Sequence, residues 1–466
     1  MGALNVTHVV GMVLAMLAVF SVGIYAGRRV RTALDFSVSG RKAGSFLVMG
    51  TILGTLVGGA STVGTAQMAY LYGFSAWWFT LGGGLGCLII AVFLVRPMQE
   101  TKFETIPRFI SSSYGTTAGV AAALFVSIGM FINVMPQIFS SMALLSSMFP
   151  VNLHLAAFLT VFMMIIYVFF GGVWSTGLMG ITKIMLTILS MFASGLLALY
   201  LTGGPVGITA HFPSYPWFSL FGRGVNTDLA SAFALMVGVL SSQIYFQGIF
   251  SSRNLPAARG GALLSAVIAP LIGLGGIFIG LFMRIQYPAI DPAHALPLFV
   301  INYLPSWFGG LVLATLLLAS IGTGAGLTLG VSTMLNCDIY RRLLPQADDQ
   351  KVLKVFRFLI VIIMTFALSI VLISSNNVLI LNWSYLSLGL RGATIFFPLM
   401  AVIFFKGKIS PLAGTLSVIC GPSIVIIGTL ISLTINPLYP GLAVSFLVLF
   451  IDYLKNRDRH FAELEE

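Results

Sequence analysis

Apolar stretches, most of them long enough to cross a membrane, alternate with short polar connections along the whole chain of 466 residues. A membrane-spanning helix needs about 20 mostly apolar residues. The pattern therefore predicts an all-α polytopic membrane protein with about thirteen transmembrane helices. We expect them at about 6–27, 45–70, 75–97, 117–148, 154–171, 174–202, 228–250, 260–286, 307–336, 355–375, 379–405, 410–434 and 438–454.

Composition and charge support this class. Hydrophobic residues make up 58% of the chain and charged residues 8%, whereas soluble domains carry about 25% charged residues. The formal net charge of +11 does not indicate a nucleic-acid partner, because most Lys and Arg gather in alternate loops and in the C-terminal tail. That alternation follows the positive-inside rule. It predicts a multi-pass protein of the plasma (inner) membrane, with its N-terminus outside and its C-terminus in the cytoplasm.

The chain offers no signs of catalysis. The three cysteines are isolated, no Walker-type phosphate loop is present, and no His–acid or Cys–His set falls at membrane depth. The first apolar run lacks a basic leader, so we expect a retained helix and not a signal peptide. We expect no enzyme activity, no catalytic residue and no cofactor. The expected partners are the lipid bilayer and a small-molecule solute, and the sequence leaves the oligomeric state open.

Two predicted spans are unusual because Gly, Ser and amide residues cluster near their centres. The stretches are 53–64 and 238–248. Such a sequence weakens a helix and exposes backbone carbonyls, which membranes tolerate only where the carbonyls line a cavity. Two interrupted spans in corresponding halves indicate a binding site between inverted repeats. Ordinary close packing of small residues is the alternative.

Six short motifs along residues 30–400 resemble the sodium:solute symporter family, which includes transporters of sugars, proline, pantothenate, sialic acid and monocarboxylates. Each motif is weak alone, but their order along the chain is specific. They lie at 35–41, 64–73, 104–109, 171–174, 243–255 and 338–341.

The resemblance implies a LeuT-type fold with a 5+5 inverted repeat in a single transporter domain over 1–466. The first repeat would occupy 45–202 and the second 228–405. The first helix and its basic loop (6–44) and the last two helices with the basic tail (410–466) would lie outside the repeats. Solute would bind at the two interrupted helices. Sodium would bind between the carbonyls of Gly54 and Val57 and hydroxyls of the helix at 307–336.

The sequence departs from the family at this ion site. Gly322 stands where the family has a hydroxyl, so only Thr323 keeps one. Lys183 stands where the family has a glutamine. Sodium and protons both remain candidates for the coupling ion, and we expect no other metal.

Two cations lie within predicted spans, Lys183 and Arg391. Intramembrane charges are costly and mark function by default. The Lys183 ammonium could replace the sodium ion, and by losing and regaining a proton it could give proton coupling. It could also extend its ammonium to the membrane surface or contact the solute. Arg391 could anchor a carboxylate or cap carbonyls of a neighbouring broken helix.

We therefore expect a secondary active solute:cation symporter that works by alternating access on a small organic solute, which we expect to bear a carboxylate because both intramembrane charges are positive. The alternatives are a proton-coupled or uncoupled uniporter or exchanger, and a solute sensor without transport. The residues expected to line the solute site are Gly58, Gly59, Ser61, Thr62, Asn133, Gln137, Ser242, Gln243, Gln247 and Arg391; those of the ion site or its surrogate are Gly54, Val57, Lys183, Gly322 and Thr323.

Overall fold

The computed structural model describes residues 4–27, 43–100, 105–340, 349–374 and 378–465. The motif at 35–41 lies outside these residues, as do Glu104 and Arg341 from two other motifs and most of the basic loop within 6–44. The side chains of the 171–174 motif also lie outside the described part.

The described part of the chain is helical, and an isolated bridge between Ala43 and Ser252 is its one β-type pairing. The first half contains α1 (Val6–Gly27), α3 (Ser45–Leu56), η2 (Ala60–Gly64), α4 (Thr65–Tyr72), η3 (Gly73–Trp77), α5 (Trp78–Ile89), η4 (Ile90–Leu94), α6 (Val95–Glu100), α7 (Ile106–Tyr114), α8 (Thr116–Ile132), α9 (Val134–Met148), α10 (Leu153–Leu201), α11 (Gly204–His211) and α12 (Ser214–Trp217).

The second half of the chain also combines long and short helices. It contains α13 (Val225–Leu240), α14 (Gln243–Phe250), α15 (Leu255–Gln286), η5 (Pro292–His294), α16 (Ala295–Tyr303), α17 (Ser306–Met334), η6 (Leu335–Tyr340), α19 (Asp349–Ile373), α20 (Ile380–Phe404), α21 (Pro411–Leu430) and α22 (Leu438–Glu465).

Ten stretches of the described residues are long and apolar enough to cross a membrane. Three shorter apolar helices accompany them, at Val6–Leu17, Ser45–Leu56 and Leu153–Val168. The polytopic all-α class is therefore confirmed, while the count of thirteen spans stays a prediction.

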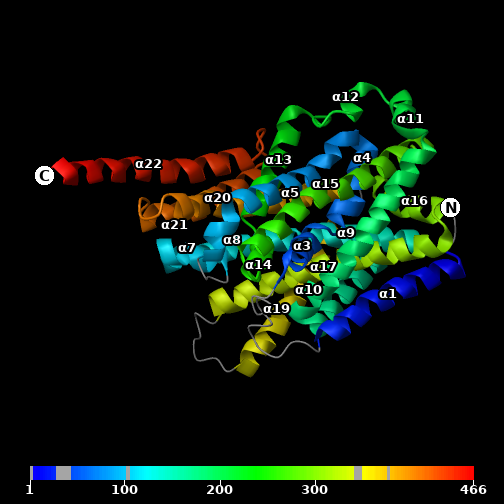
Figure 1. The fold of residues 1–466 in the computed structure, drawn as a ribbon, viewed down its shortest axis with the longest axis horizontal. Helices are drawn as coiled ribbons and strands as arrows, with labels where there is room; N and C mark the ends of the chain where they lie inside the picture. Colours follow the sequence, from blue (N-terminus) through cyan, green and yellow to red (C-terminus); the bar gives the residue numbers. More distant parts are fainter. Residues whose placement is uncertain (1–3, 28–42, 101–104, 341–348, 375–377, 466) are drawn as a thin grey trace.

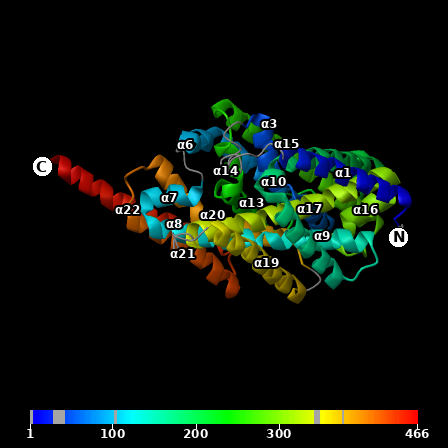
Figure 2. The same cartoon turned by 90° about the horizontal axis from the view of Figure 1, so that it is seen from below.

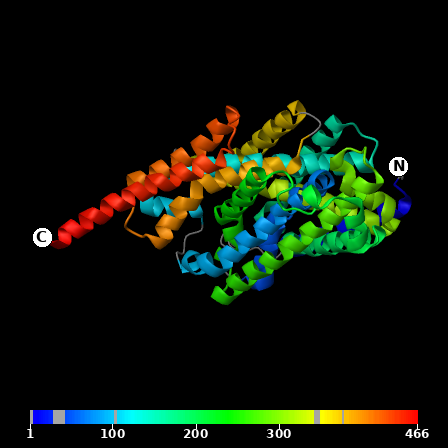
Figure 3. The ribbon, with the colours of Figure 1, turned by 90° about the horizontal axis from the view of Figure 1, so that it is seen from above.

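The long helices run roughly along the longest dimension of the molecule, and the two termini lie at its opposite ends (Figure 1). The end with the N-terminus also carries α11 and α16 (Figure 1), and α22 projects beyond the bundle at the other end (Figure 2). Burial separates centre from periphery. In α17, 83% of the most apolar window is buried, compared with 28% in α19 and 22% in α22. Figure 3 shows α22 along the edge of the bundle.

Helix α10 contains two of the predicted spans. Helical backbone continues from Leu153 to Leu201, yet Tyr167 and Lys183 both lie beside Gly322. A Cβ atom built on Gly322 would be 3.4 Å from the Tyr167 hydroxyl and 3.9 Å from Lys183 Cδ. A straight helix would separate these two residues by about 24 Å at 1.5 Å per residue. Helix α10 is therefore not straight between them, and its division into two spans stays a prediction.

Local sequence explains where several helices begin. The side chains of Asn152, Asn254 and Ser410 accept hydrogen bonds from the backbone N–H three residues ahead. These are N-caps of α10, α15 and α21, and they satisfy N–H groups that the first turn leaves unpaired. Proline follows in the first turn of α15 and α21, where its missing N–H costs nothing.

Candidate solute and ion site

The first interrupted span breaks between α3 and η2. Helix α3 ends at Leu56, Val57 takes an extended conformation (φ −95°, ψ 97°), and helix resumes at Ala60. Neighbouring helices press on the two glycines of the break. A Cβ at Gly58 would lie 2.8 Å from Thr323 Oγ1, and one at Gly59 would lie 2.3 Å from Ser140 Cβ. The break therefore needs glycine because α9 and α17 approach its backbone closely.

Polar side chains satisfy the exposed backbone of this break. The Gly59 N–H donates to Gln137 Oε1 over 2.8 Å. Ser61 Oγ lies 3.0 Å from the Gly58 nitrogen, and the Thr62 hydroxyl donates to the Gly58 carbonyl over 2.9 Å. Four predicted site residues of helix 45–70 and Gln137 of α9 are thus brought together.

The Lys183 ammonium lies beside the same break. Its Nζ donates to the carbonyl oxygen of Gly54 over 2.7 Å and to Thr323 Oγ1 over 2.9 Å. A third hydrogen bond reaches the carbonyl oxygen of Ala319 over 3.3 Å. The side chain is 6% exposed, so its ammonium is directed inward and not toward the surface. Its contacts join α10 to α3 and α17.

Gly322 and Val57 take no polar part in these contacts. Gly322 faces the Lys183 stem, since a Cβ atom on this glycine would lie 3.9 Å from Lys183 Cδ. The Val57 N–H donates to the Leu53 carbonyl, which closes the last turn of α3. The third oxygen that Lys183 contacts belongs to Ala319, which sequence reasoning missed, because a backbone carbonyl has no side-chain signature.

The second interrupted span breaks at Ser241 and Ser242, between α13 and α14. The Ser242 hydroxyl donates to the Gly238 carbonyl over 2.5 Å. It accepts a hydrogen bond from Arg391 Nη1 over 2.9 Å. This break therefore also meets a cation, and the cation comes from α20.

Arg391 is the largest side chain with no exposed surface among the residues that the structure describes. Its Nη2 donates to Ser387 Oγ over 2.9 Å, and its Nε donates to the Ser387 carbonyl over 3.3 Å. Among the described residues, neither Arg391 nor Lys183 forms an ion pair. Gly129 of α8 makes room for the arginine stem, since a Cβ there would lie 2.6 Å from Arg391 Cγ.

The other predicted solute residues are Gln243, Gln247 and Asn133, of which Gln243 directly follows the second break. The Gln243 side chain accepts a hydrogen bond from the Ile106 N–H over 2.8 Å and so caps the start of α7. Gln247 lies one turn further along α14, away from the break. Asn133 lies at the junction of α8 and α9 and is buried. Pro136, three residues on, explains the junction because its ring clashes with a helical carbonyl four residues earlier.

A buried acid was missed at the start of α13. Asp228 has no exposed surface, and its Oδ1 lies 2.6 Å from Arg223 Nη2 and 2.7 Å from the Ser75 hydroxyl. In the sequence it stands at the first residue of the predicted span 228–250, with no signal of burial. Burial is possible because the carboxylate is paired with a guanidinium and hydrogen-bonded.

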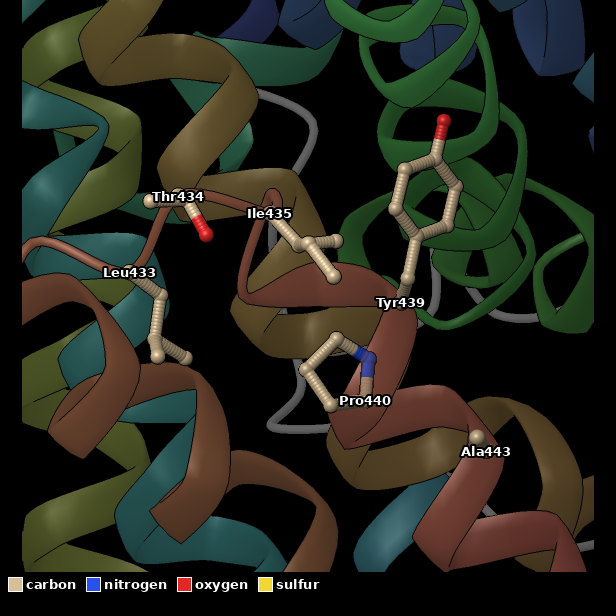
Figure 4. Close-up of a pocket in the computed structure, with 6 residues that line it drawn as sticks. All are labelled: Leu433, Thr434, Ile435, Tyr439, Pro440 and Ala443. Carbon is tan, nitrogen blue, oxygen red and sulfur yellow. The ribbon is translucent and has the colours of Figure 1, made fainter.

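A groove lies along the connection from α21 to α22 and the first turns of α22, with a volume of about 440 Å³. Apolar side chains dominate its lining, and the Tyr439 hydroxyl points away from it (Figure 4) and reaches the Asn226 carbonyl over 3.3 Å. None of its lining residues comes from the broken helices, so it is not part of the site above. They are Leu433, Thr434, Ile435, Tyr439, Pro440 and Ala443.

Comparison with known proteins agrees with the fold. The model of the sodium:solute symporter family matches residues 36–410. The human high affinity choline transporter 1 is 25% identical over 435 residues, which cover 87% of this chain and 74% of the transporter. The bovine sodium/myo-inositol cotransporter 2 is 21% identical, covering 85% of this chain and 65% of the cotransporter.

Solved structures show the same architecture. A Na⁺-coupled sialic acid symporter in a substrate-bound, outward-open state superposes with a TM-score of 0.79 at 18% identity, covering 97% of this chain and 98% of that chain. A nucleobase-cation-symport-1 family transporter in a closed conformation gives 0.56 at 13% identity, covering 91% and 94%. The fold is LeuT-like. The chain belongs to the sodium:solute symporter family, and it is a secondary active symporter of the membrane and not an enzyme.

Proposed function

We propose that this protein carries a small organic solute with a carboxylate group and that the Lys183 ammonium takes the place of the sodium ion. One observation supports the proposal most directly. All three hydrogen bonds of Lys183 Nζ reach oxygens at the break of α3, namely those of Gly54, Ala319 and Thr323. Hard cations such as sodium are held by oxygen ligands of this kind, and an ammonium with three donors satisfies the same oxygens.

The charges around the site favour an anionic or zwitterionic solute. Lys183 and Arg391 are both buried, and neither pairs with a carboxylate in the described part of the chain. The buried acid Asp228 is neutralised by Arg223. A solute carboxylate would supply the missing negative charge in a setting of low polarity, where opposite charges attract strongly.

Coupling to sodium is not required by this arrangement. With the ammonium in place, a second cation among the same oxygens would be repelled. Release of a proton would remove that charge and weaken the ties from α10 to α3 and α17. The proposed transporter is therefore independent of sodium, and a proton is its coupling ion.

A second candidate solute is a choline-like cation, because the human high affinity choline transporter 1 is 25% identical to this chain. Two buried cations oppose that assignment. A positively charged solute would be repelled by these charges, and no acidic residue stands at 56–60 or 240–243 to compensate them.

Uptake into liposomes tests the proposal. The purified protein would be given labelled monocarboxylates, zwitterionic amino acids, their amide or ester analogues, choline and myo-inositol, under imposed sodium or proton gradients. We expect uptake of at least one carboxylate, loss of uptake for its ester, and stimulation by an inward proton gradient alone. Uptake that needs sodium would overturn the ammonium assignment. Choline uptake without carboxylate uptake would overturn the solute class.

A further inference from the structure

The two breaks share a feature at the end of the helix that precedes each of them, α3 in one case and α13 in the other. In each, a cation lies at the C-terminal turn of the half-helix that ends there. Lys183 contacts the Gly54 carbonyl of α3 directly. Arg391 reaches the Gly238 carbonyl of α13 through one hydroxyl, that of Ser242. Gly54 lies four residues before Gly58, and Gly238 lies four residues before Ser242, so the contacts occur at matching positions.

Electrostatics explains why a cation is favourable there. The C-terminal end of a helix carries a partial negative charge, and its last carbonyls lack helical partners. Here the ends of α3 and α13 are buried within the bundle, where solvent cannot screen them. A cation at each end compensates that charge, and one tethered to a side chain cannot diffuse away.

Every nitrogen of the Arg391 guanidinium is hydrogen-bonded within the protein, whereas a side chain that binds solute would keep a nitrogen available for it. Each of its three guanidinium nitrogens bonds Ser242 or Ser387. Ser387 in turn donates to the Gly129 carbonyl over 2.6 Å, which adds α8 to the assembly. The guanidinium thus connects α20, the α13–α14 break and α8. Breaking these bonds would leave a buried charge unsatisfied.

We propose that Arg391 is a positioning residue that holds the α13–α14 break, as Lys183 holds the α3–η2 break, so that each half of the fold carries its own tethered cation. The α13–α14 break then keeps its shape without a bound metal ion. This inference does not depend on the identity of the solute.

Accessibility of the break tests the inference without any solute. The three native cysteines would be replaced, and Ser241, a buried neighbour of Ser242 in the break, would become the one cysteine through Ser241→Cys. We expect Arg391→Ala to raise the rate of maleimide labelling about tenfold, because charged hydrogen bonds are lost. Added guanidinium should restore the slow rate. Lys406→Ala, in an exposed loop, should leave it unchanged.

Gly129→Ala provides a second variant that keeps the charge. The new methyl group would meet Arg391 Cγ at 2.6 Å and displace the guanidinium, so labelling should again accelerate. Equal labelling rates in the parent, Arg391→Ala and Gly129→Ala would overturn the inference. The inference would also be overturned if added guanidinium restored carboxylate uptake by Arg391→Ala without slowing its labelling, because that result would make Arg391 a direct solute ligand. A failure of carboxylate uptake alone would affect only the proposed function.

Discussion

Lys183 Nζ lies 2.7 Å from the carbonyl oxygen of Gly54, a residue 129 positions earlier in the chain, and so connects α10 to α3. The same nitrogen lies 2.9 Å from Thr323 Oγ1. One ammonium therefore ties α10, α3 and α17 together at a break in the bundle. Motion of α3 against α10 would break the bond to Gly54, and under the proposed function this is how the ammonium would act in alternating access.

Removing the ammonium should create a sodium requirement. Lys183→Ala combined with Gly322→Ser takes away the tethered charge and supplies a second hydroxyl beside Thr323. We expect uptake by this double variant to depend on sodium, with the rate rising at least about tenfold between sodium-free and sodium-containing buffer. Uptake with and without sodium measures the effect.

Each single variant serves as a control. Lys183→Ala alone should respond to sodium weakly, because it has one hydroxyl fewer. Gly322→Ser alone should stay independent of sodium, because the ammonium remains. A double variant that transports at the parent rate in sodium-free buffer would contradict the ion-surrogate role.

The amide of Gln67 ties α4 to the start of α20. Its Nε2 donates to the Val378 carbonyl over 2.9 Å, and its Oε1 accepts from the Ile380 N–H over 2.9 Å. Gln67→Leu removes both bonds and should loosen this end of α20. We expect a thiol reagent to label Ser384→Cys about tenfold faster, the effect of losing one or two buried hydrogen bonds. Gln67→Asn, which shortens the side chain but keeps the amide, should give a smaller increase. If Gln67→Leu left the labelling rate unchanged, the two Gln67 hydrogen bonds would not be what limits access of the reagent to position 384.

The buried pair of Arg223 and Asp228 should be important for stability. Asp228→Asn leaves the guanidinium without a charged partner, which costs about 3–5 kcal/mol in a buried pair. A thermal unfolding assay in detergent should show a clear loss of stability. The exposed pair of Arg96 and Glu100, 73% and 66% exposed, is the matched control, and Arg96→Ala should change stability by less than about 1 kcal/mol. Equal effects of the two variants would contradict the argument.

Acid should loosen the connection between α15 and α16. Partial burial opposes ionisation of Asp291, but hydrogen bonds from His294 and from the Ala293 N–H hold the pKa of Asp291 below its usual value. A lowered pKa means that the ionised carboxylate stabilises the folded loop at neutral pH. The contribution is lost as the pH falls below about 4.

Hydrogen exchange measures this effect at the Ala293 amide, which lies 3.0 Å from Asp291 Oδ1. After correction for the intrinsic rate, exchange should accelerate between pH 6 and pH 3. Asp291→Ala, which removes the acceptor, should exchange fast at both values. Protection that is the same at both pH values in the parent protein would rule out this role for the carboxylate.

The sequence alone determined the class of fold and the places where helices fail. Apolar length depends on local composition, and it predicted the polytopic helical bundle. The clusters of Gly and Ser at 53–64 and 238–248 predicted both interruptions, because residues that weaken a helix act within their own turn. The family resemblance then predicted the LeuT-like arrangement.

Only the tertiary structure decided what meets at those interruptions. Ala319 contributes a carbonyl, which every residue has, so no pattern could single it out. Gln243 looked like a solute ligand beside a break, yet its amide caps α7, because the direction of a side chain depends on how distant helices pack. From the sequence, the flexible Lys183 side chain could place its ammonium either at the membrane surface or at buried oxygens. The approach of α3 and α17 places three acceptors within reach of its ammonium, and that packing is not encoded in any one stretch of the chain.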